Sequence, residues 1–238
     1  MDPTHKPTAV LPGILAMAVI VVASNVLVQF LYGDWLTWGA FTYPFAFLVT
    51  DLMNRLYGVA TARKVVIAGF AVGIICSLVG SQIQGEFGPL VTLRIAVGSG
   101  VAFLLAQLID VSIFDRLRAG SWWRAPLASS LIGSACDTSL FFFIAFSAEL
   151  AFLEPGNDVS WANEVLPLLG MGPLAPLWVS LAFADWLVKL ALALLALVLY
   201  QRVRVYGLAQ QAAIVFVLVG INQLICQWVQ NLQGVGAR

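Results

Sequence analysis

The chain contains 238 residues, of which 61% are hydrophobic and only 10% are charged, and its formal net charge is zero. Its mean hydropathy of +0.94 lies well above that of water-soluble domains, so the composition excludes an ordinary globular protein. The basic residues form no stripe along the chain, which excludes a nucleic-acid surface and leaves the lipid bilayer as the expected surroundings.

Six apolar segments follow one another along the chain, and each is long enough to cross a bilayer as a helix of roughly 20 residues. They lie at about residues 9–31, 39–57, 64–84, 92–114, 126–147 and 176–200. The first run is longer than the apolar core of a secretory signal, so we expect a retained span. The sequence therefore predicts an all-α fold, a polytopic membrane helical bundle of six transmembrane helices within residues 1–206.

Residues 207–238 form a tail whose relation to the bilayer the sequence leaves open. The apolar run from Ala212 to Ile221 is too short to span alone, and its continuation is rich in amide side chains. A seventh span, a re-entrant segment and an amphipathic surface helix all fit this pattern.

The positive charges indicate one orientation for the six spans. Nearly all fall on alternate loops or adjoining helix ends: Lys6, Arg55, Arg63, Lys64, Arg116, Arg118, Arg124, Arg202 and Arg204. Only Arg94 falls on the other side. Because basic loops face the cytoplasm, we expect the N-terminus there. The long external loop is acidic, and it is either a solvated loop or the site of a short interfacial helix.

Two sequence features suggest how the helices pack. Gln29 and Gln107 occupy comparable places in the first and fourth spans. Asp51 and Asp137 do the same in the second and fifth. Two halves of three spans would have opposite topology, so this weak correspondence predicts a 3+3 inverted repeat. A GxxxG pattern at residues 69–73 favours close contact between helices of the bundle over a dimer face.

Three aspartates carry the strongest chemical signal. Asp51, Asp137 and Asp185 each lie about ten residues into a predicted helix, which at about 1.5 Å per residue places them near the bilayer midplane. A charged residue there costs about 2.5–3.5 kcal/mol, so each should face the protein interior, pair or become protonated. Arg55 and Lys189 lie four residues after the first and the third of them, a spacing that allows intrahelical ion pairs. The aspartates either hold the bundle together or bind a ligand or proton.

Other polar and aromatic side chains lie at membrane depth. The polar ones are Asn25, Gln29, Thr50, Asn54, Gln107, Ser134, Thr138 and Ser139. Helix packing explains each of them singly, but the set is larger than packing alone requires. Phe41, Tyr43 and Phe45 precede Asp51 by one or more helical turns, so a flat ring could stack there while the carboxylate accepts its N–H groups. Trp38 suits an interfacial anchor.

Common catalytic motifs are absent from the sequence. It contains no Walker loop, no HExxH and no GxSxG, and its single histidine is His5. Cys76, Cys136 and Cys226 lie scattered in apolar stretches, without the spacing of a zinc site or a disulfide framework. We therefore expect neither an enzyme nor a bound metal or cofactor.

Several motifs between about residues 20 and 200 resemble, in order, those of one protein family. They are Ser24 to Gln29, Thr37 to Phe45, Thr50 to Leu52 with Arg55, Ala62 to Lys64, Arg94 to Ala96, Gln107 to Val111, Phe114 to Arg118, Trp122-Trp123, Cys136 to Thr138 with Phe141 to Phe146, and Asp185 with Lys189. They are similar to the queuosine precursor transporter family, also called the VUT or YhhQ-like family. The resemblance implies a six-helix carrier of the bacterial inner membrane, with a fold similar to the S-components of energy-coupling factor transporters.

The substrates implied by the resemblance are 7-deazaguanines such as preQ0 and preQ1, imported for tRNA queuosine modification. The expected substrate-binding residues are Asn25, Gln29, Trp38, Phe41, Phe45, Asp51, Gln107 and Asp137. A carboxylate would accept hydrogen bonds from the N1–H and the exocyclic amine, and amide side chains would hydrogen-bond to the remaining edge. Aromatic rings would stack on the two faces of the base. Asp51 with Arg55, and Asp185 with Lys189, are the expected coupling or structural ion pairs.

Several points stay open at this stage. Nothing in the chain is expected to bind ATP, so an ion gradient, a separate ATPase module and facilitated diffusion all remain candidates for the driving force. The alternative to a self-sufficient importer is an S-component-like subunit that captures a vitamin or purine-like ligand for such a module. A homodimer and a purely structural membrane scaffold also remain open.

Overall fold

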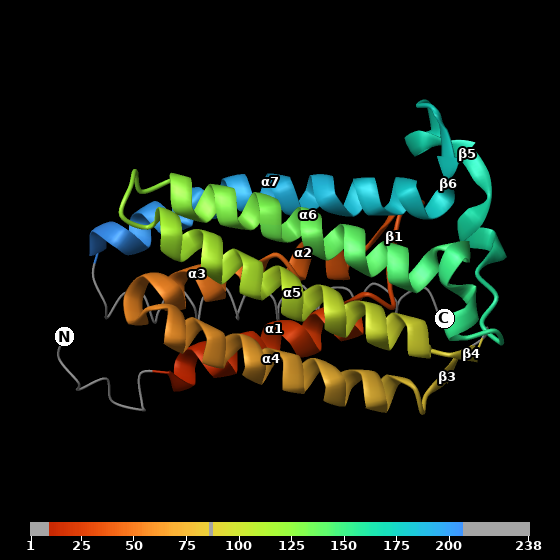
Figure 1. The fold of residues 1–238 in the computed structure, drawn as a ribbon, viewed down its shortest axis with the longest axis horizontal. Helices are drawn as coiled ribbons and strands as arrows, with labels where there is room; N and C mark the ends of the chain where they lie inside the picture. The colour runs from red at the N-terminus through yellow and green to blue at the C-terminus, as the bar shows by residue number, and fades with distance from the viewer. Residues whose placement is uncertain (1–9, 86–87, 207–238) are drawn as a thin grey trace, which may run out of the picture.

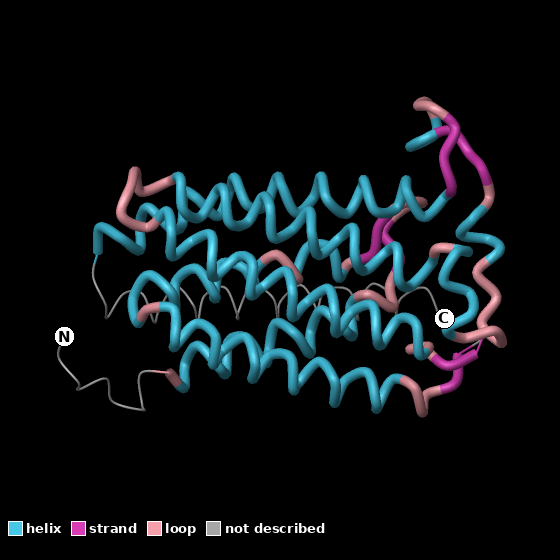
Figure 2. Tube along the Cα trace, in the orientation of Figure 1, coloured by secondary structure: helices cyan, strands magenta, loops and turns pink. Residues whose placement is uncertain are grey.

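The computed structural model describes residues 10–85 and 88–206, so the expected tail at 207–238 lies outside the described residues. Long helices lie side by side in one bundle (Figure 1). They are α1 (Leu11–Leu27), α4 (Val59–Gly80), α5 (Leu93–Leu117), α6 (Arg124–Phe146) and α7 (Leu177–Tyr206). Figure 2 shows that the strands are confined to the connections between helices.

Length and hydropathy mark four helices in the described ranges as able to cross a membrane. These are α4, α5, α6 and the Leu177–Leu195 part of α7. The helix α1 is apolar but has only 17 residues, fewer than a full span needs. The prediction of a multi-pass helical membrane protein is therefore confirmed, whereas the count of six spans and the inverted repeat stay predictions.

The helix predicted over residues 39–57 is interrupted, which corrects the expectation of one continuous span. Residues Gly39–Thr42 form α2 and Phe45–Tyr57 form α3. Pro44 lies at the junction, where it has no N–H to donate and its ring clashes with the preceding turn. The backbone N–H of Ala46 instead donates to the carbonyl oxygen of Tyr43 at 3.0 Å. Tyr43 therefore lies at a kink.

Within residues 10–85 and 88–206, three two-stranded antiparallel hairpins and several short turns connect the helices. The hairpins are β1 (Leu31–Tyr32) with β2 (Leu36–Thr37), β3 (Gln84–Gly85) with β4 (Gly88–Pro89), and β5 (Val165–Pro167) with β6 (Leu174–Pro176). The loop from α6 to α7 also contains the 3-10 turns η2 (Ala148–Leu153), η3 (Ser160–Asn163) and η4 (Leu168–Gly170). This loop therefore contains short turns and a hairpin rather than an interfacial α-helix.

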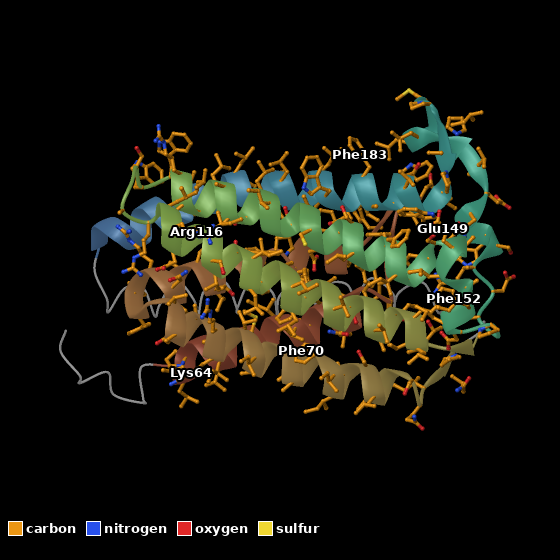
Figure 3. The ribbon with its side chains drawn as sticks, in the orientation of Figure 1. Lys64, Phe70, Arg116, Glu149, Phe152 and Phe183 are labelled. Atoms are coloured by element: carbon orange, nitrogen blue, oxygen red, sulfur yellow. The ribbon has the colours of Figure 1, made fainter. Side chains whose placement is uncertain are left out.

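Opposite charges mark the two ends of the bundle. Figure 3 shows Lys64 and Arg116 toward one end, and Glu149 with Phe152 toward the other. In the acidic loop, the backbone N–H of Ser160 donates to Asp158 at 2.9 Å, and this hydrogen bond lowers the pKa of the exposed carboxyl. The separation of charge is the pattern that the basic and acidic loops predicted.

Arg94, the basic residue that departs from this pattern, is fully buried where α5 begins. Its guanidinium donates to the carbonyl oxygens of Ile144 (3.0 Å) and Ser147 (2.5 Å) at the C-terminal end of α6. Glu154 accepts hydrogen bonds from the backbone N–H groups of Leu93 (3.2 Å) and Arg94 (3.1 Å). Because a cation suits a helix C-terminus and an anion suits an N-terminus, both side chains stabilise helix ends.

The apolar core lies between α1, α3, α4 and α5. Met17, Val49, Val65 and Phe103 are buried members of it. Gly69 allows α4 to approach α1 closely, since a Cβ at this position would lie 2.5 Å from Met17 Cγ. The interpretation of the GxxxG pattern as a close helix contact is therefore confirmed at Gly69.

Candidate functional site

A network of polar side chains joins α6, α7 and the α2–α3 kink inside the bundle. Lys189 is only 5% exposed, and its Nζ lies 2.7 Å from Asp137 Oδ2 and 2.6 Å from Asp185 Oδ2. It also donates to Thr138 Oγ1 at 2.9 Å, and Thr138 donates to Asp185 at 2.8 Å. The Tyr43 hydroxyl donates to Asp137 Oδ1 at 3.4 Å. We call these five residues the lysine network. In this network the ammonium of Lys189 faces two carboxyls, those of Asp137 and Asp185.

A second polar cluster, the aspartate pair, consists of Asp51 on α3 and Asp110 on α5. The two residues are 2% and 0% exposed, and their carboxyls interact directly. Ser129 on α6 donates to Asp51 Oδ1 at 3.1 Å. Neither carboxyl oxygen of Asp110 has a hydrogen-bond partner in good geometry among the residues that the structure describes. The aspartate pair therefore holds more acceptors than donors.

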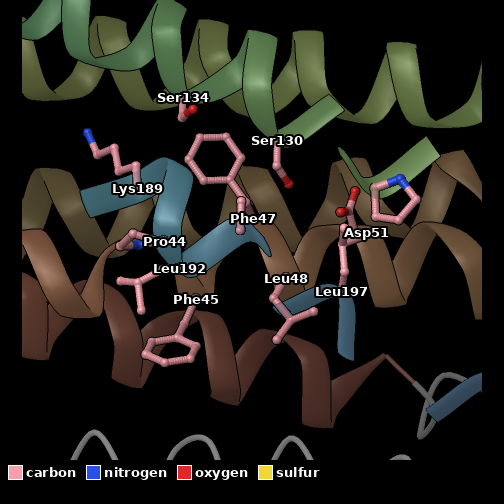
Figure 4. A pocket seen from close by; sticks show the side chains of 12 residues that line it. Pro44, Phe45, Phe47, Leu48, Asp51, Ser130, Ser134, Lys189, Leu192 and Leu197 are labelled. Atoms are coloured by element: carbon pink, nitrogen blue, oxygen red, sulfur yellow. The ribbon is translucent and has the colours of Figure 1, made fainter. Parts of the chain in front are cut away.

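A small cavity lies between the aspartate pair and the lysine network. Figure 4 shows Asp51 and Lys189 on opposite sides of this cavity, with Ser130 and Ser134 of α6 between them. Its volume is about 30 Å³, which is enough for about one water molecule. A purine-sized ring does not fit there in this conformation, although Phe45 and Asp51 both line the space.

A much larger cavity, of about 550 Å³, lies between α1, α4 and α5. This volume falls within the range of small-molecule sites. Its wall is mainly apolar, with Asn25 and Tyr43 among the polar groups, and it extends to Glu154 in the external loop. Glycines such as Gly73 leave the space open because they carry no side chain. Tyr43 thus belongs to both the large cavity and the lysine network.

The structure distributes the predicted binding residues over separate places. Asn25 lines the large cavity, and its Nδ2 donates to the carbonyl oxygen of Val21 at 2.8 Å. Asp137 lies in the lysine network, on the far side of Tyr43. Gln107 is buried, but its Oε1 accepts from Thr50 at 2.6 Å and binds the helices together. Neither of the two cavities unites the whole predicted set.

Three more of the predicted binding residues, Gln29, Trp38 and Phe41, line neither cavity. Gln29 is exposed because α1 already ends at Leu27. Trp38 and Phe41 pack against Tyr32, with ring centroids 4.9 and 5.2 Å apart. The aromatic pair therefore contacts the β1–β2 hairpin, and neither of its rings lines the cavity at Asp51.

The predicted pair of Asp51 with Arg55 does not form within the described part of the chain. Arg55 Nη1 instead donates to the carbonyl oxygen of Arg118 at 2.8 Å. That carbonyl follows the end of α5, where partial negative charge attracts a cation. The structure does bring Asp185 and Lys189 together, across one turn of α7.

Two features of the site were missed by the sequence analysis. Asp110 received no role of its own, although a carboxyl in the apolar segment 92–114 is the same signal that selected Asp51. The contact of Lys189 with Asp137 joins two helices, and spacing along one helix cannot predict it.

Comparisons with known proteins agree on one family. Residues 37–203 match the family model described as "Putative vitamin uptake transporter". A "Queuosine precursor transporter" of Escherichia coli (strain K12) is 42% identical over 142 residues, which are 53% of this chain and 64% of the relative. A "Probable queuosine precursor transporter" of Haemophilus influenzae (strain ATCC 51907 / DSM 11121 / KW20 / Rd) is 35% identical over 173 residues, 68% of this chain and 65% of the relative.

A third relative, the "Probable queuosine precursor transporter" of Bacillus subtilis (strain 168), is 26% identical over 187 residues, 70% of this chain and 71% of the relative. The chain spans just under two thirds of the length of the first two relatives. No solved structure matches the chain.

Proposed function

This chain belongs to the "Putative vitamin uptake transporter" family, and we propose that it imports queuosine precursors, 7-deazaguanines such as preQ0 and preQ1, across the bacterial inner membrane. The observation that carries the proposal is the family match over residues 37–203, which covers α2 to α6 and most of α7. The three relatives named above are all described as transporters of queuosine precursors.

The large cavity is the proposed entry and binding site for the base. It has a suitable volume, a mainly apolar wall and a few polar groups, the combination expected of a small-molecule site. Phe70 and Phe103 offer aromatic faces in this wall, and Asn25 offers an amide. A planar ring between these side chains would bury its faces and keep its edge for hydrogen bonds.

Asp137 is the proposed acceptor for the guanine-like edge of the base. The N1–H and the exocyclic amine of a 7-deazaguanine are neighbouring donors that fit two carboxylate oxygens. The Tyr43 hydroxyl occupies one of these oxygens at 3.4 Å, a long hydrogen bond that a ligand could displace at small cost. Lys189 holds the other oxygen at 2.7 Å, which keeps a second lone pair for the ligand. The kink at Pro44 adjoins Tyr43, so a side-chain rotation there would open the large cavity to Asp137.

The charges of the lysine network also suit preQ1, whose aminomethyl group is cationic. Lys189 faces both Asp137 and Asp185, so ionisation of all three groups leaves one negative charge in surplus. A ligand cation would offset that charge, whereas the neutral preQ0 would not. We therefore expect tighter binding of preQ1 than of preQ0.

Binding of labelled preQ1 to the purified protein tests this site. Gly73→Leu places a side chain in the large cavity and should weaken binding by roughly tenfold or more, which corresponds to about 1.4 kcal/mol. Asp137→Asn should remove the bidentate acceptor. Ile75→Phe is the matched control, because Ile75 lies on the same helix, is 60% exposed and does not line the cavity. Equal binding by Gly73→Leu and the control would place the site elsewhere.

The proposed topology has six spans, with the α2–α3 unit as the second and the N-terminus in the cytoplasm. It rests on the basic end marked by Lys64 and the acidic end marked by Glu149 (Figure 3). A membrane-impermeant thiol reagent should label Glu149→Cys in intact cells, and Lys64→Cys only after the membrane is opened. The reverse labelling pattern would contradict the orientation.

A further inference from the structure

We propose that the aspartate pair, Asp51 with Asp110, is a proton-binding site inside the membrane-embedded core. The two carboxyls come from different helices, α3 and α5, and both lie against one stretch of α6, where Ser129 donates to Asp51 at 3.1 Å and a Cβ at Gly133 would lie 3.3 Å from Asp110 Cβ. At this separation their charges repel each other. Both residues are almost completely buried. Two adjacent carboxylates in such a place cannot both stay ionised without a large repulsive cost, so one of them holds a proton.

No cation of the described residues neutralises the aspartate pair. Arg55, one turn along α3, donates to the carbonyl oxygen of Arg118. Lys189 of α7 lines the same small cavity as Asp51, but its three donors serve Asp137, Asp185 and Thr138. The side chains that α1 and α4 bury carry no charge, and the contact from α6 is a serine hydroxyl.

Hydrogen-bond acceptors outnumber donors at the aspartate pair, and a bound proton supplies a further donor. Both oxygens of Asp110 are without a partner in good geometry among the described residues, and so is Oδ1 of Asn54. Asn54 lies one turn after Asp51 and donates to the carbonyl oxygen of Val111, next to Asp110. These three unpaired atoms are acceptors, whereas the nearby donors are the Ser129 hydroxyl and the unpaired Nε2 group of Gln107, one turn before Asp110. A protonated carboxyl adds an O–H group and reduces the number of unpaired acceptors.

The small cavity gives the aspartate pair a route to the lysine network. Asp51 and Lys189 both line it, with Ser130 and Ser134 between them (Figure 4). A single water in its 30 Å³ volume would find carboxyl and hydroxyl groups as partners. Substrate binding at Asp137 that released one of the three Lys189 donors would give this water an ammonium partner as well, and would so connect Asp137 to Asp51.

Coupling of this proton to import rests on the proposed function. One proton carried inward with each neutral base would allow accumulation of roughly tenfold for each pH unit across the membrane, because one unit of pH corresponds to a tenfold equilibrium factor. The proton would bind when the aspartate pair is open to the outside and leave when it is open to the cytoplasm. The direction of the gradient therefore sets the direction of net transport.

Infrared spectroscopy of the purified protein tests the proton site without any substrate. The native protein near neutral pH should show the C=O stretching band of a protonated carboxyl, and the double variant Asp51→Asn with Asp110→Asn should lose it, whereas either single variant leaves one buried carboxyl that can keep the proton. Asp115→Asn is the matched control, since Asp115 lies on the same helix, is partly exposed and pairs with Arg118. Absence of the band from the native protein would overturn the proposal even if a variant failed to fold.

Transport into proteoliposomes then tests the coupling. With an acidic exterior, the native protein and Asp115→Asn should accumulate preQ0 by roughly tenfold for each pH unit, and Asp110→Asn should lose this accumulation. Transport of labelled base that does not depend on the pH gradient, or that depends on a sodium gradient, would contradict proton coupling. It would not contradict the proposed import of the base. A native protein that shows the infrared band but moves no base would contradict the proposed function and not the proton site.

Discussion

Replacement of Lys189 by methionine should strongly destabilise the bundle. The ammonium lies 2.7 and 2.6 Å from two carboxyls and is almost fully buried. At these distances each attraction is roughly 6 kcal/mol for an effective dielectric constant of about 20, and the desolvation of the ions offsets part of it. Removal of one partner from a buried ion pair costs about 3–5 kcal/mol, because the remaining charge stays buried.

The assay is thermal unfolding of the detergent-purified protein. A loss of about 3–5 kcal/mol should lower Tm by on the order of 10 °C for a chain of this size. Asp115→Asn breaks the exposed pair with Arg118 and should cost less than about 1 kcal/mol. In the double variant Lys189→Met with Asp137→Asn, part of the loss should be recovered, since fewer carboxylates remain unpaired. A native Tm in Lys189→Met, or strictly additive effects in the double variant, would refute this reasoning.

The remaining predictions concern helix contacts and helix ends. Gly69→Val should cost about 1–3 kcal/mol in thermal unfolding, because a Cβ would lie 2.5 Å from Met17 Cγ. Gly73→Ala should be close to neutral, since its Cβ would lie 3.7 Å from Val21; equal losses in the two variants would contradict the packing of α4 on α1. Glu154→Ala should lower stability by about 1 kcal/mol through the loss of an anion at the start of α5, and high salt should reduce the difference from the native protein.

The positions of the long helices could be predicted from the sequence, because their apolar runs match the thickness of the bilayer. Helix boundaries were harder to predict where a single residue changes the backbone conformation. Pro44 lies inside the predicted helix 39–57, and its missing N–H breaks that helix and gives Tyr43 its place at a kink. The short hairpin strands β5 and β6 in the external loop were not predicted either, since runs of three residues carry little periodic signal.

The accuracy of each site prediction depended on whether groups on other helices compete for the same side chain. The spacing of Asp185 and Lys189 along α7 anticipated a contact that the structure contains. The same spacing failed for Asp51 and Arg55, because a backbone carbonyl on another helix competes for the guanidinium. The partnership of Asp51 with Asp110 joins residues far apart in sequence, and only the packing of α3 against α5 creates it.

Uptake of labelled preQ1 and preQ0 by cells that lack their own synthesis and carrier tests the central claim most directly. Cells that express the native chain or Asp115→Asn should accumulate the label, and cells that express Asp137→Asn at the same membrane level should not. Absence of uptake from a well-expressed native chain would contradict the proposed import of 7-deazaguanines. Undiminished uptake through Asp137→Asn would instead contradict the assignment of Asp137 as the acceptor of the base.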